Sequence, residues 1–318
     1  MANAICLGEL LIDFVPTVTG TDLTDAPAFI KAPGGAPGNV AVGLARLGVE
    51  SAFMGKVGDD AFGHFLADTL REAGVDVSPL RFSTEARTAL AFVSLQADGE
   101  REFMFYRHPS ADMLFTPREV DMEAINRAQL LHFGSISLIS EPSRSATLYA
   151  VDAARAAGGL VSYDPNLRLP LWPDADTARK EMLLGFSKAQ VVKLSDDESA
   201  FLTGLSDLNA ACQALWHDDL KLMVVTRGQA GCVYFTPNFT GAVESFTVEA
   251  VDATGAGDGF VAGLLQGVLL DPTIVQDEAR LRELCRFANA VGALATIQRG
   301  AIPALPNREQ VKEFLNSR

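Results

Sequence analysis

The stretch Asp252-Ala-Thr-Gly-Ala-Gly-Asp258, followed by Gly-Phe-Val-Ala-Gly, is the most informative part of this 318-residue chain. Apolar residues recur after it at helical spacing, which predicts a helix that begins near Gly257. The start of a helix presents unpaired backbone N–H groups and the positive end of the helix dipole. Because Gly255, Ala256 and Gly257 carry almost no side chain, this turn is a candidate cradle for an anion.

Asp258 follows the cradle, where a base would have to lie to accept a proton from a hydroxyl group attacking a bound phosphate. The motif therefore predicts a phosphoryl-transfer site. The alternative is a tight turn with an acidic residue in the first helical turn, where negative charge interacts well with the dipole. Short glycine-rich motifs are weak by themselves, so the remainder of the chain has to separate these two interpretations.

From about residue 129 onward, the chain alternates between strands and helices. Strands are expected at 129–134, 160–164, 190–194 and 222–226. This alternation predicts an α/β fold in which helices cover both faces of a mostly parallel sheet. The other expected elements are a strand at 3–12, a helix at 39–47, a strand at 51–57, a helix at 60–74, an antiparallel edge at 231–235 and 243–248, and helices at 277–298 and 307–317.

A β-hairpin is predicted ahead of this alternating part. Residues 88–95 and 101–107 alternate in character on either side of Asp98-Gly99, a turn signal. The alternation places Phe103, Phe105 and Arg107 on one face and Met104 and Tyr106 on the other. No repeat, low-complexity tract or linker divides the chain, so residues 1–318 are expected to form one domain from which the hairpin projects.

Composition narrows the class of protein. Hydrophobic residues make up 48% of the chain and charged residues 21%, which is typical of a compact globular protein. No apolar run reaches the roughly 20 residues of a membrane span, and no signal-peptide pattern opens the sequence, so a cytoplasmic location is expected. The net charge of −14 disfavours nucleic acid and membranes as partners. The scattered cysteines and histidines disfavour a disulfide framework or a zinc site.

Polar residues follow several of the expected strands, and ligands of open parallel sheets bind beyond the carboxyl ends of the strands. These residues are Asp13, the segment Asp164-Pro-Asn-Leu-Arg168, the segment Lys193-Leu-Ser-Asp-Asp-Glu198 and the segment Thr226-Arg-Gly228. Their coincidence favours a binding site over solvated loops. Lys193, Thr226, Gly228 and Gly231 are candidate ligands of phosphate or nucleotide.

Asp164, Asn166 and Arg168 lie two residues apart, so in an extended strand end they would project to one side. Arg168 offers a rigid fork of donors that suits a transferring phosphate, and Asn166 suits a phosphate oxygen or a metal-bound water. The alternative is a surface arginine paired with Asp164.

Glu198 stands in an acidic trio with Asp196 and Asp197. One of the three is a candidate ligand of Mg²⁺, which takes one or two carboxylates together with phosphate oxygens and water. Acidic residues are also normal in the first turn of a helix, so at least one is expected to be only structural. Residues 33–39 also precede a helix; there, two glycines would admit a ligand and Asn39 would bind a polyol, unless Asn39 only caps the helix.

Three common motifs are absent from the sequence. They are Gly-x4-Gly-Lys-Ser/Thr, a Gly-x-Gly-x-x-Gly run that opens a helix after the first strand, and His-Glu-x-x-His. Their absence disfavours P-loop NTPases, ordinary dinucleotide-binding proteins and zincins.

Together these residues resemble the ribokinase-like (PfkB-type) carbohydrate kinases, from residue 3 to about 306. The first family signature runs from Gly34-Gly35 through Asn39 and Gly58-Asp59 to Gly63, and the second is the segment from 252 to 263. The segments 105–112 and 300–306 are most similar to the fructokinase branch. The resemblance implies a three-layer α/β/α fold with a small projecting β-lid at about 14–33 and 86–108.

The resemblance also implies a role for each candidate residue. Asp258 would be the general base, Gly255, Ala256 and Gly257 the anion hole, and Arg168 the balancing cation. The sugar would be held by Asp13, Gly34, Gly35, Asn39, Arg107 and Asn166. ATP would be bound by Thr226, Gly228 and Asn289, besides Lys193 and Gly231.

Ions and a partner subunit are implied as well. Mg²⁺ would lie near Glu198 through water, and potassium near Asp252, Thr254 and the segment 290–300. The family's Asn-x-x-Glu motif reads Ser195-Asp-Asp-Glu198 here, so the glutamate is kept while the first position differs. Lids of this family often pair between subunits, which implies a homodimer through the apolar face of the hairpin.

The expected activity is ATP-dependent phosphorylation of fructose at a primary hydroxyl. A 2-keto-3-deoxygluconate kinase and a riboside kinase of the same family are alternatives. A catalytically silent sugar-binding relative is a further alternative, although it would have no chemical need for Asp258, the anion hole and Arg168 together.

Overall fold

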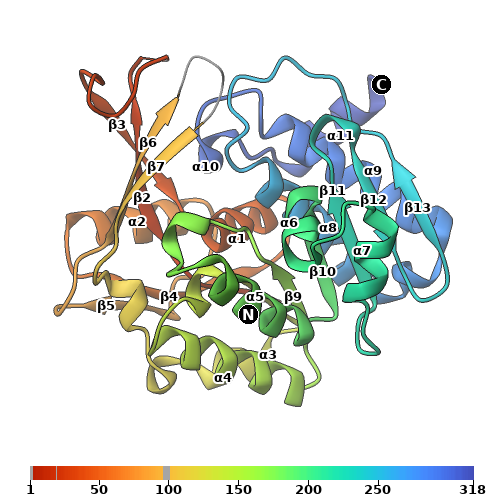
Figure 1. Ribbon diagram of the computed structural model, residues 1–318, viewed down its shortest axis with the longest axis horizontal. Helices are drawn as coiled ribbons and strands as arrows, with labels where there is room; N and C mark the ends of the chain where they lie inside the picture. The colour runs from red at the N-terminus through yellow and green to blue at the C-terminus, as the bar shows by residue number, and fades with distance from the viewer. Residues whose placement is uncertain (1–2, 19, 96–100) are drawn as a thin grey trace.

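The computed structural model describes residues 3–18, 20–95 and 101–318. Its largest element is a nine-stranded sheet in the order β13-β12-β11-β10-β9-β8-β1-β4-β5 (Figure 1). The strands from β11 to β5 run parallel, and β12 and β13 form an antiparallel edge. The strands are β1 Ala4–Leu7, β4 Ser51–Gly58, β5 Leu80–Ser83, β8 Leu130–Gly134, β9 Leu160–Asp164, β10 Val191–Ser195, β11 Leu222–Thr226, β12 Cys232–Phe235 and β13 Thr240–Val243.

Helices cover both faces of this sheet, because its strands alternate between two apolar clusters. In β1, Ala4 and Cys6 belong to one cluster while Ile5 and Leu7 belong to the other. The first cluster is completed by α1 Ala36–Arg46, α2 Ala61–Glu72, α8 Ala256–Leu270, α9 Glu278–Leu294, α10 Ala301–Ala304 and α11 Arg308–Asn316. The second is completed by α3 Met122–Arg127, α4 Ser143–Ala156, α5 Ala175–Ser187, α6 Asp196–Thr203 and α7 Leu208–Leu215.

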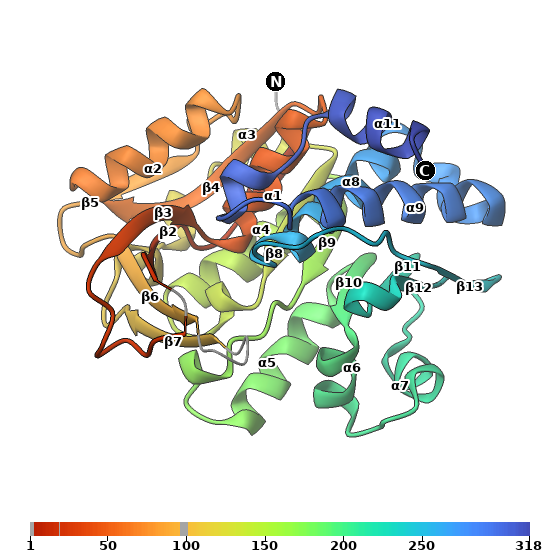
Figure 2. The ribbon, with the colours of Figure 1, turned by 90° about the horizontal axis from the view of Figure 1, so that it is seen from above.

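Figure 2 shows α8, α9 and α11 on one side of the sheet and α5, α6 and α7 on the other. The predicted three-layer α/β/α architecture is therefore confirmed. The strand order also defines where a ligand is expected to bind. From β1 the chain adds β4 and β5 on one side, then returns to add β8, β9, β10 and β11 on the other. Such a reversal opens a crevice at the carboxyl ends of the strands.

A second, four-stranded sheet in the order β3-β2-β6-β7 projects from the main body and forms the lid (Figure 1). Its core contains aromatic rings, since Phe14 stacks on Phe92 at 4.9 Å and Phe29 meets the edge of Phe92 at 5.3 Å. The strands are β2 Leu11–Pro16, β3 Phe29–Gly34, β6 Ala89–Leu95 and β7 Arg101–Tyr106.

The hairpin predicted from the sequence is the pair β6 and β7, which run antiparallel. Met104 and Tyr106 are 41% and 58% exposed, whereas Arg107 is buried, as the alternation predicts. The turn at Asp98-Gly99 and the side chain of Phe103 lie outside the described residues.

The prediction of one strand over 3–12 is wrong. The segment forms β1 in the main sheet and the start of β2 in the lid, and the break falls at Gly8, whose φ is +153°. A Cβ at Gly8 would lie 2.7 Å from Pro37 Cγ, so glycine is required there. Asp13 consequently lies within a lid strand and not at the end of the first strand. Residues Ala4–Leu7 and the first two residues of β2 are all apolar and buried, so hydrophobic pattern alone cannot reveal the change of sheet.

The strand predicted at 243–248 is also wrong, because β13 ends at Val243 and no strand follows up to residue 250. Phe246 of this segment packs against Phe314 of α11, with the ring centroids 5.1 Å apart. The other elements named from the sequence are found within a few residues of their predicted ends.

Helices α1 and α8 pack unusually close together, and this contact positions the site described below. A Cβ at Gly43 would lie only 2.6 Å from the Cβ of Ala262, so the two helices touch through backbone and one methyl group. Small residues at a crossing point allow such an approach, and added volume in a packed core forces the elements apart.

We therefore predict that Gly43→Ala lowers the free energy of unfolding by about 1–3 kcal/mol, although alanine is the better helix former. Chemical denaturation with a circular-dichroism readout measures the change. The double variant Gly43→Ala/Ala262→Gly removes the clash and should recover part of the loss. Additive effects of the two substitutions would contradict a direct contact.

Candidate active site

The first turn of α8 is the centre of the site. Gly255 caps the helix with φ of +82°, and a Cβ there would lie 2.7 Å from the Cβ of Ala301. Glycine is therefore required both by backbone conformation and by space. The Ala256 N–H donates a 3.2 Å hydrogen bond to the Ala253 carbonyl, whereas the other N–H groups at a helix start ordinarily lack a carbonyl one turn earlier, and the dipole adds positive potential. This end of the helix suits an anion.

Asp258 lies in that turn, buried, and is held by Asn39 from α1. The Asn39 Nδ2 group donates a hydrogen bond of 2.7 Å to Asp258 Oδ2. Burial raises the pKa of Asp258 to about 6, while the bond from Asn39 and the nearby charges of Lys193 and Arg168 lower it and Asp164 raises it further. A carboxyl group with a pKa near neutral and a fixed orientation suits general-base work.

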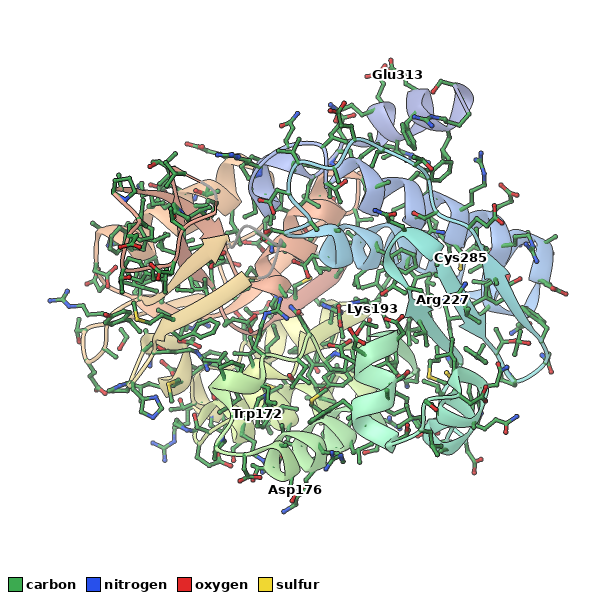
Figure 3. The ribbon with its side chains drawn as sticks, turned by 45° about the horizontal axis from the view of Figure 1, so that its top comes forward. Trp172, Asp176, Lys193, Arg227, Cys285 and Glu313 are labelled. Carbon is green, nitrogen blue, oxygen red and sulfur yellow. The ribbon has the colours of Figure 1, made fainter. Side chains whose placement is uncertain are left out.

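Lys193 forms an ion pair with Asp164 beneath the turn. Lys193 Nζ lies 3.1 Å from Asp164 Oδ2, and both side chains are at most 10% exposed. The ammonium also lies near Gly257, where an added Cβ would be 3.2 Å from it. Figure 3 places Lys193 inside the molecule, in contrast to Asp176 and Glu313 at the periphery. A fixed positive charge therefore lies below the proposed anion cradle.

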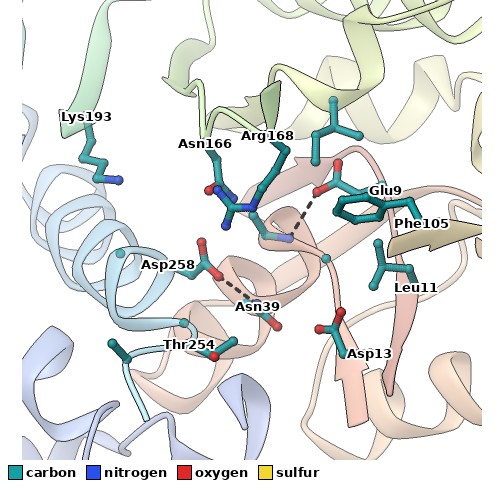
Figure 4. A pocket seen from close by; sticks show the side chains of 16 residues that line it. Glu9, Leu11, Asp13, Asn39, Phe105, Asn166, Arg168, Lys193, Thr254 and Asp258 are labelled. Carbon is teal, nitrogen blue, oxygen red and sulfur yellow. Dashed lines mark hydrogen bonds between the residues drawn. The ribbon is translucent and has the colours of Figure 1, made fainter. Parts of the chain in front are cut away.

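The segment after β9 differs from the extended strand end that the spacing predicted. The strand stops at Asp164, and Asn166 adopts a left-handed conformation with φ of +47°. Asp164 pairs with Lys193, and not with Arg168 as the alternative interpretation had it. Asn166 and Arg168 instead line a cavity (Figure 4).

Glu198 supports this segment from the start of α6. Its Oε1 accepts a 2.7 Å hydrogen bond from the Leu167 N–H, and its Oε2 accepts one of 2.8 Å from the Ser195 N–H. Ser195 Oγ in turn accepts a hydrogen bond from the Glu198 N–H, which completes a capping box. The departure from the family's asparagine is thus explained locally, since serine and asparagine both cap helices.

A cavity of about 180 Å³ collects most of the predicted sugar and catalytic residues (Figure 4). It is bounded by α8 on one side and by the lid strands on the other. From the predicted set it is lined by Asp13, Gly35, Asn39, Asn166, Arg168, Lys193, Thr254, Gly255, Gly257 and Asp258. Lys193, predicted as a nucleotide ligand, lies in this cavity and not in its neighbour.

A second cavity, of about 380 Å³, lies on the other side of the α8 turn. It collects the remaining nucleotide candidates, Thr226, Gly228, Gly231 and Asn289, together with Ala256. Asn289 also donates a hydrogen bond of 3.1 Å to the Glu244 carbonyl, which holds the segment that forms one wall. Ala253 and Gly257 line both cavities, so the two spaces meet at the anion cradle.

Two predicted sugar ligands do not line the first cavity. An added Cβ at Gly34 would lie 2.1 Å from Asp13 Oδ2, so this glycine leaves room for the aspartate side chain. Arg107 is 5% exposed, and its Nε donates a 2.8 Å hydrogen bond to Asp112 behind the cavity wall.

Six residues that sequence reasoning left out of the site also line the first cavity: Glu9, Leu11, Ala36, Phe105, Ile136 and Ala253. The alternation of the hairpin placed Phe105 on the face of Arg107 and could have identified it. Glu9 was detectable as an acidic residue within an otherwise apolar segment.

Asp252 ties the motif to the segment near residue 300. One carboxylate oxygen accepts hydrogen bonds from the Thr254 N–H and hydroxyl, and the other accepts one of 2.9 Å from the Gly300 N–H. Within the described ranges no group of three or more His, Cys, Asp or Glu side chains could hold a metal ion. No helix in that part of the chain is long and apolar enough to cross a membrane.

Known proteins share this sequence and architecture. The chain is 56% identical over 312 residues to probable fructokinase-4 of Arabidopsis thaliana. The matched residues make up 98% of this chain and 96% of that protein. It resembles the crystal structure of fructokinase with bound ATP from Xylella fastidiosa, with a TM-score of 0.92 and 36% identity. The match covers 100% of this chain and 99% of that chain. The crystal structure of a fructokinase double mutant from Vibrio cholerae O395, bound to fructose, ADP and potassium ion, is also similar, with a TM-score of 0.89 and 38% identity. The match covers 99% of this chain and 98% of that chain.

Residues 1–308 match the pfkB family of carbohydrate kinases, which is nearly the whole chain. Two cavities that meet at a helix start, with the buried Asp258 carboxylate lining the smaller one, fit the phosphorylation of a sugar. The chain belongs to the pfkB carbohydrate kinase family.

Proposed function

We propose that this protein is a fructokinase, which transfers the γ-phosphoryl group of ATP to a primary hydroxyl of fructose. One observation carries the proposal: a polar cavity and a larger cavity meet at Gly257, beside the buried carboxylate of Asp258. The relatives named fructokinases support the choice of sugar. The whole chain, residues 1–318, is proposed to act as one kinase domain with its lid.

The reaction follows from these positions. Asp258 accepts the proton of the sugar hydroxyl, whose oxygen attacks the γ-phosphorus as the bond to the bridging oxygen of ADP breaks. Asn39 fixes the carboxylate through its 2.7 Å hydrogen bond, which keeps the base aimed at one hydroxyl. The N–H groups at Gly255, Ala256 and Gly257 stabilise the charge on the migrating group, with Arg168 facing them across the cavity.

The sugar is proposed to bind Asp13, Gly35, Asn39 and Asn166 in the smaller cavity, and Gly34 and Arg107 would support that cavity from behind. The nucleotide is proposed to bind Thr226, Gly228, Gly231 and Asn289 in the larger one. Lys193 supplies positive charge beneath the phosphoryl group. Closure of the lid over the sugar would exclude water from the reaction.

The donor groups near the site fit two cations in different ways. Both oxygens of Glu198 already accept backbone hydrogen bonds, which fits contact with a nucleotide-borne Mg²⁺ through water. Asp252 and Thr254 lie against the segment at 296–300, since the Val251 N–H bonds the Thr296 carbonyl at 2.8 Å, and this oxygen-rich turn suits potassium. When bound, the cations would neutralise phosphate charge and reinforce the anion cradle.

The function is tested with Mg·ATP and a panel of fructose, ribose, 2-keto-3-deoxygluconate and a riboside, with ADP release as the readout. We predict strong turnover with fructose and a loss of about 10²–10⁴-fold in kcat for Asp258→Asn. The amide at position 258 keeps an acceptor for Asn39, so fructose binding should remain. Asp271→Asn, at the other end of α8, is the control. Preference for another panel member would correct the substrate, and binding without turnover would indicate a silent relative.

The acid limb of the pH profile tests the electrostatics of the base. Asp258 must be ionised to accept a proton, so kcat/KM should fall as the pH drops through about 6. Lys193→Met removes a charge that lowers the pKa of Asp258, and the limb should move to higher pH. The further change Asp164→Asn removes a charge that raises this pKa and should move the limb back. Unchanged profiles in all variants would refute a role for this ion pair.

We also propose that the lid mediates a homodimer. Met104 and Tyr106 lie on one face of β7 and are 41% and 58% exposed. Ile30 of β3 is 60% exposed on the opposite face of the lid, since its neighbour Lys31 shares the face of Met104 through the pairs with Phe14 and Phe92. Large exposed apolar side chains on a small projecting sheet are typical of an interface. Size-exclusion chromatography with light scattering should give the mass of two chains, and Ile30→Asp/Tyr106→Asp should give one. A wild-type mass of one chain at all concentrations would contradict the proposal.

A further inference from the structure

Glu9 is a buried acidic residue of the sugar cavity that the mechanism above does not use. It follows β1 at the topological switch of the sheet and is 3% exposed. It lines the same cavity as Asp258. Figure 4 labels both residues among the side chains that line it.

The two carboxylate oxygens of Glu9 have different surroundings. Oε1 accepts a 3.2 Å hydrogen bond from the Ala36 N–H at the start of α1. Oε2 is shielded from solvent yet accepts no hydrogen bond from any residue in the described ranges. A buried oxygen without a hydrogen-bond donor destabilises the folded protein, so a native site that keeps one calls for a functional reason.

Nearby basic groups do not satisfy this oxygen. Arg107 is the cation whose charge acts on Glu9, but its Nε and Nη2 groups both donate to Asp112. Burial raises the pKa of Glu9 to about 7, while its own backbone N–H, Arg107 and the Ala36 N–H lower this pKa and Asp112 raises it further. Glu9 is thus a polar group held rigidly at a cavity wall with one oxygen still able to bond.

We propose that Glu9 recognises the sugar: Oε1 fixes the turn at Gly35-Ala36, and Oε2 forms a hydrogen bond with a secondary hydroxyl of the bound ketose. Glu9 is then a specificity-determining residue and takes no part in proton transfer. The inference rests on the proposed function, since it assumes that a sugar occupies this cavity. A polyhydroxylated ligand supplies the donor that a buried carboxyl oxygen lacks.

The test combines Glu9→Gln with fructose and with fructose analogues that each lack one secondary hydroxyl. The substitution keeps size and shape, and Glu72→Gln on the exposed face of α2 is the matched control. We expect the KM for fructose to rise about 10- to 100-fold, the loss of one hydrogen bond to a charged group. The KM for ATP and the melting temperature should not change.

Calorimetric titration measures how tightly the wild-type protein and Glu9→Gln bind fructose and each analogue, which gives the coupling between Glu9 and each hydroxyl. One deoxy analogue should bind the wild-type protein about 10- to 100-fold more weakly than fructose, and Glu9→Gln should bind fructose and that analogue equally. Additive losses, or a variant that binds every sugar like the wild type, would overturn the inference. So would wild-type protein that binds all analogues as tightly as fructose, a result that needs no variant to fold. Absence of wild-type turnover with fructose would instead refute the proposed function.

Discussion

The site depends on one hydrogen bond, the 2.7 Å contact between Asn39 and Asp258, which joins residues 219 positions apart. Each residue lies in the first turns of its helix, so the bond can form only if α1 and α8 pack closely with their starts together. Gly43 permits this approach, because a Cβ there would lie 2.6 Å from Ala262. Helix packing in the core therefore sets the orientation of the proposed base.

Around this bond the protein buries several charged groups, which is costly unless each is compensated. Asp164 is compensated by Lys193, and Glu198 by two backbone N–H groups. Asp258 is only partly compensated, so its pKa rises to about 6. A base that titrates there is ionised at neutral pH but remains a better proton acceptor than an exposed aspartate. The same burial gives Glu9 an oxygen that suits a ligand hydroxyl.

Much of this arrangement could be read from local patterns. The motif at 252–258 predicted a helix start, and α8 begins at Ala256. The alternation of strands and helices predicted a parallel sheet, and the polar residues after its strands do gather around two adjoining cavities. These predictions succeeded because helix starts and strand ends are local features whose position in an α/β sheet follows a general rule.

Where the sequence failed, the deciding contacts were distant ones. Residues 3–12 change from one sheet to another without any change in apolar pattern, and Lys193 reaches the smaller cavity because Asp164 turns toward it. Only the structure shows that the neighbours of Glu9 leave one of its oxygens without a hydrogen bond. The sequence by itself determined most of the elements, the helix start at Ala256 and the family, because these depend on local conformation and on residue type. Only the tertiary structure decided which charges pair and which face a cavity, because that depends on packing between segments far apart in the chain.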